Sequence, residues 1–358
     1  MRRGESGKVH PQTMDAIGGP SLATVIPVYN EADHIEACLM SLLHQSLHPS
    51  KHMIVVVDGR STDGTVELVG KIIKQHQGDD WPLLQLVDNP NRSVPHARNI
   101  ALNSLPPSVE FLVEMIGHAT VGPQHLEQRL VAWDACLELA GDRLAAVGVR
   151  VSGHTGSASR TAAWVEGALA SPLGKSGGQF SQFSSVGQTN VPAFVMHHRK
   201  ALDTVQGWDE SFITSQDSDL SMRLLKEGYL LYRHPEPEVF MHKRSTLKQW
   251  WKMGHRYGFW RTKVLLKHPS RGKWQEFLPL FGLLATLVLF SGGMAWYWML
   301  PATYGGVLLM AGVGHALRHD DVSGVLGVPL CLLMLHASFS LGLLDGLVRK
   351  GRPSSDRA

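Results

Sequence analysis

The apolar positions in the first third of this chain alternate between two periods. Short β-branched runs are separated by stretches in which apolar residues recur at helical spacing. The runs predict strands at residues 23–28, 53–57, 83–87 and 111–113. The intervening stretches predict helices at residues 35–47, 65–75 and 94–105. This alternation is typical of an α/β domain whose mostly parallel sheet is covered by helices on both faces.

The end of the chain has a different pattern. Charged residues are absent from three successive apolar runs, at residues 277–298, 300–317 and 322–344. Runs of this length can cross a bilayer, so they predict about three transmembrane helices. Trp296, Tyr297 and Trp298 stand between the first two runs, where an aromatic belt is expected. A set of buried helices in a soluble domain is the alternative.

These patterns divide the chain into successive parts. We expect a polar leader, an α/β domain, an amphipathic interfacial segment, about three transmembrane helices and a polar tail, at residues 1–20, 21–245, 246–275, 276–346 and 347–358. Within the α/β domain, residues 152–188 are rich in Gly, Ser and Ala, which predicts long loops around a helix at 162–169. Residues 214–227 predict an amphipathic helix.

Composition narrows the function classes. Lys and Arg number 34 and Asp and Glu 31, for a formal net charge of +3, which is too balanced to indicate a nucleic-acid binder. Cys38, Cys136 and Cys331 lie far apart, so neither a disulfide framework nor a zinc site is expected, and a reducing compartment is. No apolar run follows Arg2 and Arg3, so no signal peptide is expected. The α/β domain is therefore expected in the cytoplasm.

Basic residues bear on the orientation in the membrane. The segment before the first apolar run carries Arg261, Lys267 and Arg271, which marks it as cytoplasmic. The tail carries the same signal in Arg349 and Lys350, whereas three full crossings would put the tail outside. Either one segment is re-entrant or interfacial, or the charge rule is broken. We expect a multi-pass protein of the plasma (inner) membrane with a cytoplasmic α/β domain.

Five sequence blocks stand at predicted strand ends and helix starts. They read Val-Ile-Pro-Val-Tyr-Asn-Glu, Val-Asp-Gly-Arg-Ser-Thr-Asp-Gly-Thr, Ala-Arg-Asn, Gly-Trp-Asp-Glu-Ser-Phe and Gln-Asp-Ser-Asp-Leu-Ser-Met-Arg-Leu, at residues 25–31, 57–65, 97–99, 207–212 and 216–224. In this order they resemble family 2 glycosyltransferases, over about residues 22–265. The membrane tail is similar to that of bacterial exopolysaccharide enzymes of the succinoglycan type.

The resemblance implies a fold and a reaction. The fold is the GT-A nucleotide-diphospho-sugar transferase fold, an α/β fold followed here by C-terminal transmembrane helices. The reaction is an inverting transfer of a sugar from a nucleotide-sugar, a UDP-sugar by preference, to a lipid-linked or polysaccharide acceptor at the cytoplasmic face of the membrane.

A nucleotide-sugar site is expected at the carboxyl ends of the strands, where ligands of such sheets bind. Asp58, which ends the second strand, and Glu31, which follows the first, suit the base or the ribose hydroxyls. The resemblance adds Pro27, Tyr29 and Arg98 to this site. The alternatives are that Asp58 is a turn or helix-capping residue and that Arg98 pairs with an internal acid.

Asp217 is the candidate catalytic base. An inverting transfer needs a carboxylate that takes the proton of the acceptor hydroxyl as its oxygen attacks the anomeric carbon. The resemblance gives this role to the Asp of a Glu-Asp pair at a helix start, and here Gln216 replaces the Glu. The alternative is a helix N-terminal role for Asp217. By resemblance, Trp250 and Arg256 join Gln216 near the acceptor or the diphosphate, although a plain interfacial anchor would explain their segment as well.

The metal site departs from the family pattern. The resemblance implies Mg²⁺ or Mn²⁺, held by Asp-x-Asp or Asp-x-His after the fourth strand. Ile116 stands where the first Asp would be, and isoleucine cannot ligate a metal. His118 remains as a candidate ligand, His242 is a second one by resemblance, and Glu114 faces the same side of the strand as Ile116. We therefore expect metal binding to be weaker than the family pattern implies.

Two alternative functions follow from these departures. Ile116 and Gln216 motivate a membrane-anchored pseudoenzyme that keeps the fold as a scaffold. A polyprenyl-phosphate sugar synthase is the other alternative, because a phosphate acceptor needs no general base. The leading hypothesis predicts as partners a nucleotide-sugar donor, a lipid-linked or glycan acceptor and membrane lipid, and no nucleic acid.

Overall fold

Four parallel strands form the first half of the central sheet, in the order β3-β2-β1-β4. They are β1 (Leu22–Val28), β2 (His52–Asp58), β3 (Leu83–Asp88) and β4 (Phe111–Glu114). This computed structural model describes residues 19–153, 159–174, 183–241 and 246–352. The predicted strands of this half are confirmed, and β1, β2 and β4 are largely buried, whereas β3 lies at the edge of the sheet and is mostly exposed or half-buried.

The second half of the sheet is mixed. β8 (Met196–His198) runs antiparallel to both β4 and β6 (Leu144–Gly153), and β9 (Leu230–Met241) runs parallel to β6. The short strands β5 (Ala119–Val121) and β7 (Gly187–Gln188) pair antiparallel with β9. The sheet is therefore wholly parallel in its first four strands and mixed beyond β4, where the β6–β9 pair is parallel and the other pairs are antiparallel.

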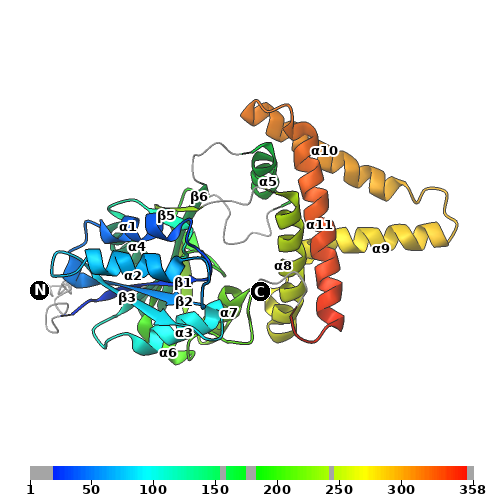
Figure 1. Cartoon of the computed structure of the whole chain (residues 1–358). Coiled ribbons are helices and arrows are strands. Elements are labelled where there is room, and N and C mark those ends of the chain that lie inside the picture. Colours follow the sequence, from blue (N-terminus) through cyan, green and yellow to red (C-terminus); the bar gives the residue numbers. More distant parts are fainter. Residues whose placement is uncertain (1–18, 154–158, 175–182, 242–245, 353–358) are drawn as a thin grey trace, which may run out of the picture.

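Helices cover both faces of this sheet (Figure 1). One face carries α1 (Ile35–Leu43), α2 (Thr65–Gln75) and α4 (His125–Ala140), and the other carries α3 (Val94–Ser104), α6 (Arg199–Thr204) and α7 (Gln216–Lys226). In β2 the alternation is visible, since Val55 and Val57 pack toward α3 and Ile54 and Val56 toward α1. Single 3₁₀ turns occur as η1 (Pro49–Lys51), η2 (Gly141–Arg143), η3 (Pro269–Arg271) and η4 (Trp274–Phe277).

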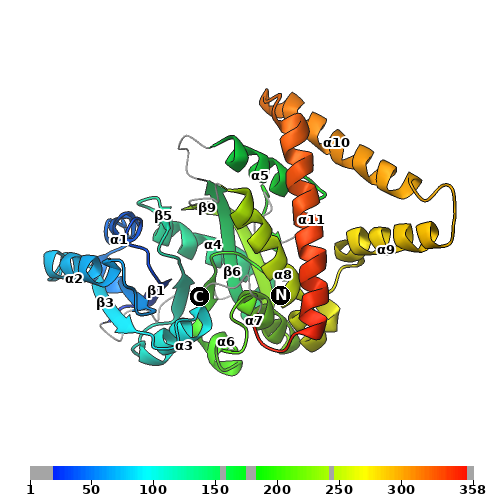
Figure 2. The ribbon, with the colours of Figure 1, turned by 45° about the vertical axis from the view of Figure 1, so that its right-hand side comes forward.

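The remaining helices lie to one side of the sheet (Figures 1 and 2). They are α5 (Arg160–Ala170), α8 (Leu247–Lys267), α9 (Leu278–Ser291), α10 (Met299–His319) and α11 (Gly324–Val348). α8 lies between the sheet and α11, α9 projects away from both, and α10 returns toward α11 and packs against it. By length and composition, the spans Trp274–Ser291, Met299–His319 and Gly324–Val348 could each cross a membrane.

Candidate active site

Two turns meet where β1 and β2 end, and we call residues 29–32 and 58–65 the β1–β2 edge. The Asn30 backbone N–H is donated to Ser61 Oγ (2.9 Å), and Asn30 Oδ1 accepts from the Thr62 N–H (2.8 Å). Asp63 Oδ2 accepts from the Ala32 N–H (3.0 Å). Asn30 has a φ of 54°, a left-handed conformation that Asn adopts more readily than most residues. The two turns are therefore held in one fixed relation.

Asp58 stabilises the second turn of the β1–β2 edge. Its side chain is buried, with 4% exposure of the residue, and Oδ1 accepts from Ser61 Oγ (2.6 Å) while Oδ2 accepts from the Ser61 N–H (3.0 Å). These contacts give Asp58 the turn role that the sequence left open as the alternative. A contact between Asp58 and a nucleotide stays a prediction.

Pro27 and Tyr29 frame the same edge. Pro27 is half-buried within β1, opposite Val57, and Tyr29 is half-buried just beyond the strand. Arg92, which the sequence patterns did not single out, places its Cζ 5.8 Å from the centroid of the Tyr29 ring. Its position in the turn after β3 was the available signal, since that turn ends at the same edge of the sheet.

Glu31 and His118 meet across the end of β4. His118 Nδ1 lies 2.8 Å from Glu31 Oε1, and both side chains are partly exposed. Gly117 allows this approach, because a Cβ there would lie only 2.9 Å from Glu31 Cγ. Ile116 packs instead against the core beneath α1 and α2. The structure thus brings together two residues to which the sequence gave separate roles.

Glu114 points into the protein interior. Its side chain is 6% exposed, Oε1 lies 2.9 Å from His197 Nε2, and Oε2 lies 2.8 Å from Arg98 Nη2. Burial alone would raise the pKa of Glu114, but the charge of Arg98 and the hydrogen bond from His197 outweigh it and lower that pKa. Both carboxylate oxygens are therefore occupied within the fold.

Arg98 links Glu114 to the candidate base. Its Nη1 lies 2.5 Å from Asp217 Oδ1, and its guanidinium lies 5.4 Å from the ring centroid of the buried Trp208. The Asp217 side chain is 28% exposed, whereas that of Arg98 is 6% exposed. Ser215, with a φ of 64°, starts α7 so that Asp217 falls in its first turn. Arg98 therefore pairs with internal acids, which was its alternative role, and orients Asp217.

A second acid anchors α7 to α8. Asp219 is fully buried and accepts from Arg223 Nε (2.8 Å), Lys267 Nζ (2.7 Å) and His268 Nε2 (2.8 Å). Burial would raise the pKa of Asp219, but these hydrogen bonds outweigh it and lower that pKa. Lys267 also donates to Asp209 Oδ2 at 2.6 Å. We call this cluster the α7–α8 junction.

Asn99 is a positioning residue that the sequence did not assign. Its Nδ2 donates to the Trp208 carbonyl (2.8 Å) and to Glu210 Oε1 (3.1 Å), and its Oδ1 accepts from the Trp208 N–H (2.9 Å). Gly207, at a φ of 67°, could not carry a Cβ, which would lie 2.5 Å from Asn99 Oδ1. The adjacency of Asn99 to Arg98 in one short block was the only signal for this clamp.

The three acceptor candidates lie in different places. Gln216 begins α7 beside Asp217. Trp250 is fully buried, and its indole N–H is donated to the Cys331 carbonyl (2.8 Å). Arg256 is 8% exposed, with Cζ 5.9 Å from the Tyr257 ring centroid. The contacts of Trp250 are thus packing contacts within the helix bundle. His242 lies outside the described residues.

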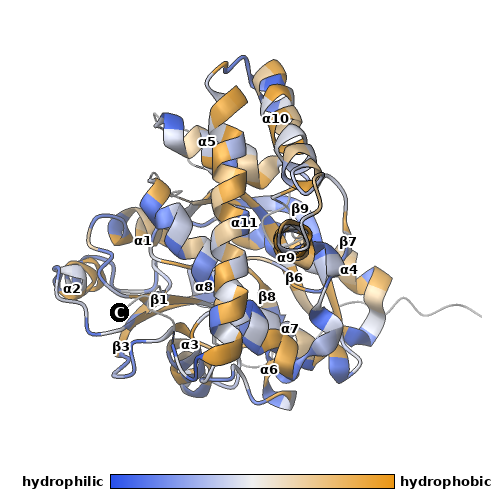
Figure 3. Cartoon of the chain, turned by 90° about the vertical axis from the view of Figure 1, so that its right-hand side faces the viewer, coloured by the Kyte–Doolittle hydropathy of each residue, from blue (hydrophilic) through white to orange (hydrophobic). Residues whose placement is uncertain are grey.

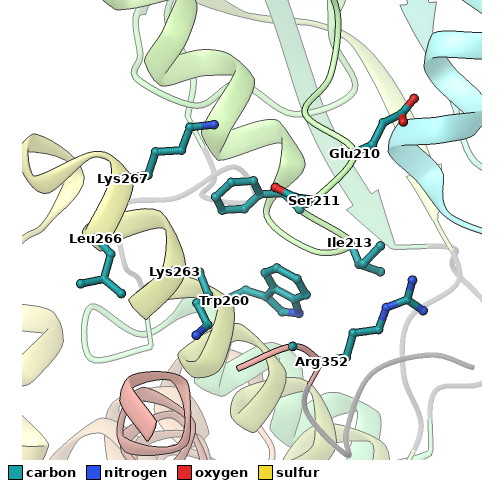
Figure 4. Close-up of a pocket in the computed structure, with 10 residues that line it drawn as sticks. Glu210, Ser211, Ile213, Trp260, Lys263, Leu266, Lys267 and Arg352 are labelled. Carbon is teal, nitrogen blue, oxygen red and sulfur yellow. The ribbon is translucent and has the colours of Figure 1, made fainter. Parts of the chain in front are cut away.

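A cavity of about 630 Å³ opens between the loop before α7 and the end of α8 (Figure 4). Its walls include Phe212 and Trp260, and three cationic side chains, Lys263, Lys267 and Arg352, stand around it. It adjoins the α7–α8 junction through Lys267. The cavity therefore combines aromatic walls and positive charge beside the helix that carries Asp217.

The residues present fit a metal site only in part. Among the described residues, no group of three or more His, Cys, Asp and Glu side chains could hold a metal ion. Ile116 offers no ligand, and Glu114 is committed to Arg98 and His197. Glu31 and His118 remain as one carboxylate and one imidazole. Such a pair suits a cation whose other ligands are substrate phosphates and water.

Comparisons with known proteins bear on the whole chain. A family model described as Glycosyl transferase family 2 matches residues 24–105, and one described as Glycosyl transferase family group 2 matches residues 143–343. The succinoglycan biosynthesis protein ExoA of Rhizobium meliloti (strain 1021) is 30% identical over 339 residues, which cover 92% of this chain and 95% of that relative. The chain belongs to glycosyltransferase family 2. It is a glycosyltransferase acting on a nucleotide sugar, and its apolar helices indicate a membrane protein.

Two further proteins similar to this glycosyltransferase are named for the transfer of different sugars. One is the dolichyl N-acetyl-alpha-D-glucosaminyl phosphate 3-beta-D-2,3-diacetamido-2,3-dideoxy-beta-D-glucuronosyltransferase of Methanococcus voltae, 23% identical over 332 residues, covering 92% of this chain and 97% of that one. The other is a solved structure, the mannosyltransferase of Pyrobaculum calidifontis in complex with GDP-Man and Mn²⁺, with a TM-score of 0.59 at 18% identity, covering 94% of this chain and 91% of that one. The structural likeness supports the GT-A fold of this chain.

Proposed function

We propose that this glycosyltransferase moves a sugar, with inversion, from a UDP-sugar to a hydroxyl of a lipid-linked acceptor at the cytoplasmic face of the plasma membrane. The position of Asp217 carries the proposal. It is a partly exposed carboxylate in the first turn of α7, held at 2.5 Å by the buried Arg98. A base fixed by a buried partner does not have to be ordered again at each turnover.

The transfer follows from this placement. The acceptor oxygen attacks the anomeric carbon, Asp217 takes the hydroxyl proton, and the bond from the anomeric carbon to the diphosphate breaks. The nucleoside diphosphate leaves with that bonding pair. In this proposal the β1–β2 edge binds the donor. Tyr29 lies beside the nucleotide base, and the Arg92 guanidinium lies near the diphosphate.

Glu31 and His118 would hold a divalent cation that enters with the donor diphosphate. When bound, Mg²⁺ or Mn²⁺ neutralises charge on the departing diphosphate. We expect Mn²⁺ to tighten UDP binding to the parent chain and to leave UDP binding to His118→Ala unchanged. Calorimetry with and without the metal measures both. Equal tightening in the variant would remove His118 from the site.

The cavity beside α8 supports an anionic, lipid-linked acceptor. Lys267 is paired with Asp209 and Asp219, so Lys263 and Arg352 are the cations that suit a phosphate. Phe212 and Trp260 suit the apolar face of a sugar. Succinoglycan biosynthesis and a dolichyl-phosphate-linked sugar figure in the names of the two relatives above, which is in keeping with such an acceptor. The acceptor hydroxyl would then reach Asp217 from the membrane side of the domain.

The test uses the full chain in detergent, a panel of nucleotide-sugars including UDP-glucose, and UDP release as the readout. Asp217→Asn is expected to lose about 10²- to 10⁴-fold in turnover while still binding UDP, because only the base is removed. Asp142→Asn, at an exposed position in η2, is the matched control. Absence of nucleotide-sugar binding in the parent would refute the proposal. Unchanged turnover in Asp217→Asn would favour a phosphate acceptor, which needs no base.

A further inference from the structure

The three apolar helices differ in how the protein covers them. Only 6% of the most apolar window of the first span and 11% of that of α10 are buried, against 44% for α11. In Figure 3 α9 is seen end-on while α11 runs across the view from top to bottom, so the two helices do not share a direction. A set of three parallel bilayer crossings does not have this arrangement.

α11 runs alongside α8 for most of its length. Trp250 near the start of α8 donates to the Cys331 carbonyl (2.8 Å), and Thr262 near its end donates to the Leu343 carbonyl (2.9 Å). Glycines permit this contact, since a Cβ on Gly258 would lie 2.0 Å from the Phe339 carbonyl oxygen. Small residues recur at four-residue intervals on both helices, at 254, 258 and 262 and at 338, 342 and 346. The two helices therefore pack in parallel at close range.

α8 does not cross a bilayer, because both of its ends belong to the sheet domain. Its start follows β9, and Lys267 at its end binds Asp209 and Asp219. Its sequence also carries Lys or Arg in almost every turn. A helix attached to one domain at both ends lies along that domain.

The two ends of α11 meet the same side of the protein. At its start the Trp164 indole N–H is donated to Ser323 Oγ (2.9 Å), and beyond its end Lys263 Nζ donates to the Arg349 carbonyl (2.8 Å). Its 25 residues span about 37 Å. A helix that crossed a bilayer would have its ends in opposite aqueous phases, whereas both of these partners belong to α5 and α8.

We propose that α9 and α10 enter the membrane as a hairpin from one face and return to it, and that α11 lies along that face with its outer side in lipid. That outer side is an exposed apolar stripe at helical spacing, formed by Leu326, Leu330, Leu333, Leu341, Leu344 and Val348. Figure 3 shows α11 as an apolar ribbon on the face from which α9 projects. Lipid is the occupant because the stripe is continuous with the uncovered hairpin.

The charges agree with this geometry. Lys273 precedes α9, Arg318 ends α10, and Arg349 and Lys350 follow α11. With a returning hairpin, all of these cations lie on one side, as the cytoplasmic excess of Lys and Arg requires. Three crossings would put Arg349 and Lys350 outside. The surface-lying α11 therefore removes the conflict between the apolar runs and the basic tail.

Cysteine labelling of the full chain in spheroplasts tests the sidedness. Lys350→Cys and Asp142→Cys both lie at exposed positions, and the three native cysteines are buried. We expect a membrane-impermeant maleimide to label neither variant before permeabilisation and both after it. Labelling of Lys350→Cys, but not of Asp142→Cys, in intact spheroplasts would overturn the proposal.

Depth measurement in nanodiscs tests the position of α11 directly. Nitroxides are attached at Leu326→Cys, Leu333→Cys and Leu344→Cys, and their access to oxygen and to a nickel chelate is compared. We expect one shallow depth at all three positions on α11. Leu284→Cys and Val288→Cys on α9, one helical turn apart, are the matched controls and should differ in depth. A maximum of depth at Leu333, with both ends shallow, would overturn the proposal.

Discussion

Two regions of the site are held by different kinds of bond. One is the β1–β2 edge, and the other is the α7–α8 junction together with the ion pairs of Arg98 beside it. At the edge, backbone N–H groups and hydroxyls meet Asn30, Asp58 and Asp63. In the other region, each ion pair has at least one buried partner, as when Arg98 meets Glu114 and Asp217, and when Lys267 meets the buried Asp219. The edge joins residues about thirty apart in sequence, whereas Arg98 and Asp217 are separated by 119 positions.

This difference has an energetic consequence. Loss of one hydroxyl at a partly exposed turn removes a net hydrogen bond of about 0.5–1.5 kcal/mol. Loss of one partner of a buried ion pair leaves an uncompensated charge and costs about 3–5 kcal/mol. We therefore expect the side of the site that carries Asp217 to be far less tolerant of substitution than the edge assigned to the donor.

Arg98→Met provides the largest contrast. It leaves Glu114 buried with His197 alone and removes the group that orients Asp217, so we expect the free energy of unfolding to fall by about 3–5 kcal/mol. Denaturant unfolding of the purified chain measures this. Arg143→Met, at an exposed position in η2, should change it by less than about 0.5 kcal/mol. Equal effects in the two variants would contradict the comparison.

Asp219→Asn tests whether α7 is held by ions. The carboxylate is fully buried and faces Lys267, His268 and Arg223, so we expect a loss of about 2–3 kcal/mol in the free energy of unfolding. Asp209→Asn shares Lys267 as a partner, but its side chain is 31% exposed, so about 1 kcal/mol or less is expected there. A larger loss for Asp209→Asn would show that burial does not set the cost.

The secondary structure of the first half of the sheet was predictable because its signals are local, whereas α4, β6 and β9 were not predicted. The alternation within β2 and the helical spacing of α2 each lie within about ten residues. The pairing of Arg98 with Glu114 and Asp217 was not predictable, since it depends on how α3, β4 and α7 meet in space. The sequence accordingly left Arg98 between a nucleotide and an internal acid.

The membrane segment shows the same limit of sequence reasoning. Hydropathy alone makes α9, α10 and α11 equivalent as candidate spans. The spacing of Gly254 and Gly258 in α8, and of Gly342 and Gly346 in α11, carried the further signal that these two helices pack closely. The small residues of α8 and α11 indicate close helix packing only once the two helices are known to be neighbours.

Acid should lower the stability of the protein because His52, in the first half of the sheet, is buried in its neutral form. His52 is buried beside Thr24 Oγ1 (2.9 Å), and burial lowers its pKa from 6.5 to about 3. Between these values the unfolded chain binds a proton that the folded chain does not, so stability falls as pH decreases. From pH 7.5 to 5.5 this amounts to about 1.4 kcal/mol. His52→Gln should shrink the difference by that amount in denaturant unfolding at the two pH values, and an unchanged difference would exclude His52 as its source.

Ser61→Ala should have the smallest effect and so sharpens the comparison from the other side. Ser61 Oγ donates to Asp58 and accepts from the Asn30 N–H, yet Ser61 and Asn30 lie near solvent. We expect a loss of about 1 kcal/mol in the free energy of unfolding, because water can replace the hydroxyl. Ser218→Ala, a half-buried position in α7, is the control for removal of a hydroxyl alone. A loss of unfolding free energy in Ser61→Ala as large as that in Arg98→Met would contradict the comparison. It would mean that Asp58 depends on Ser61 as strongly as Glu114 depends on Arg98.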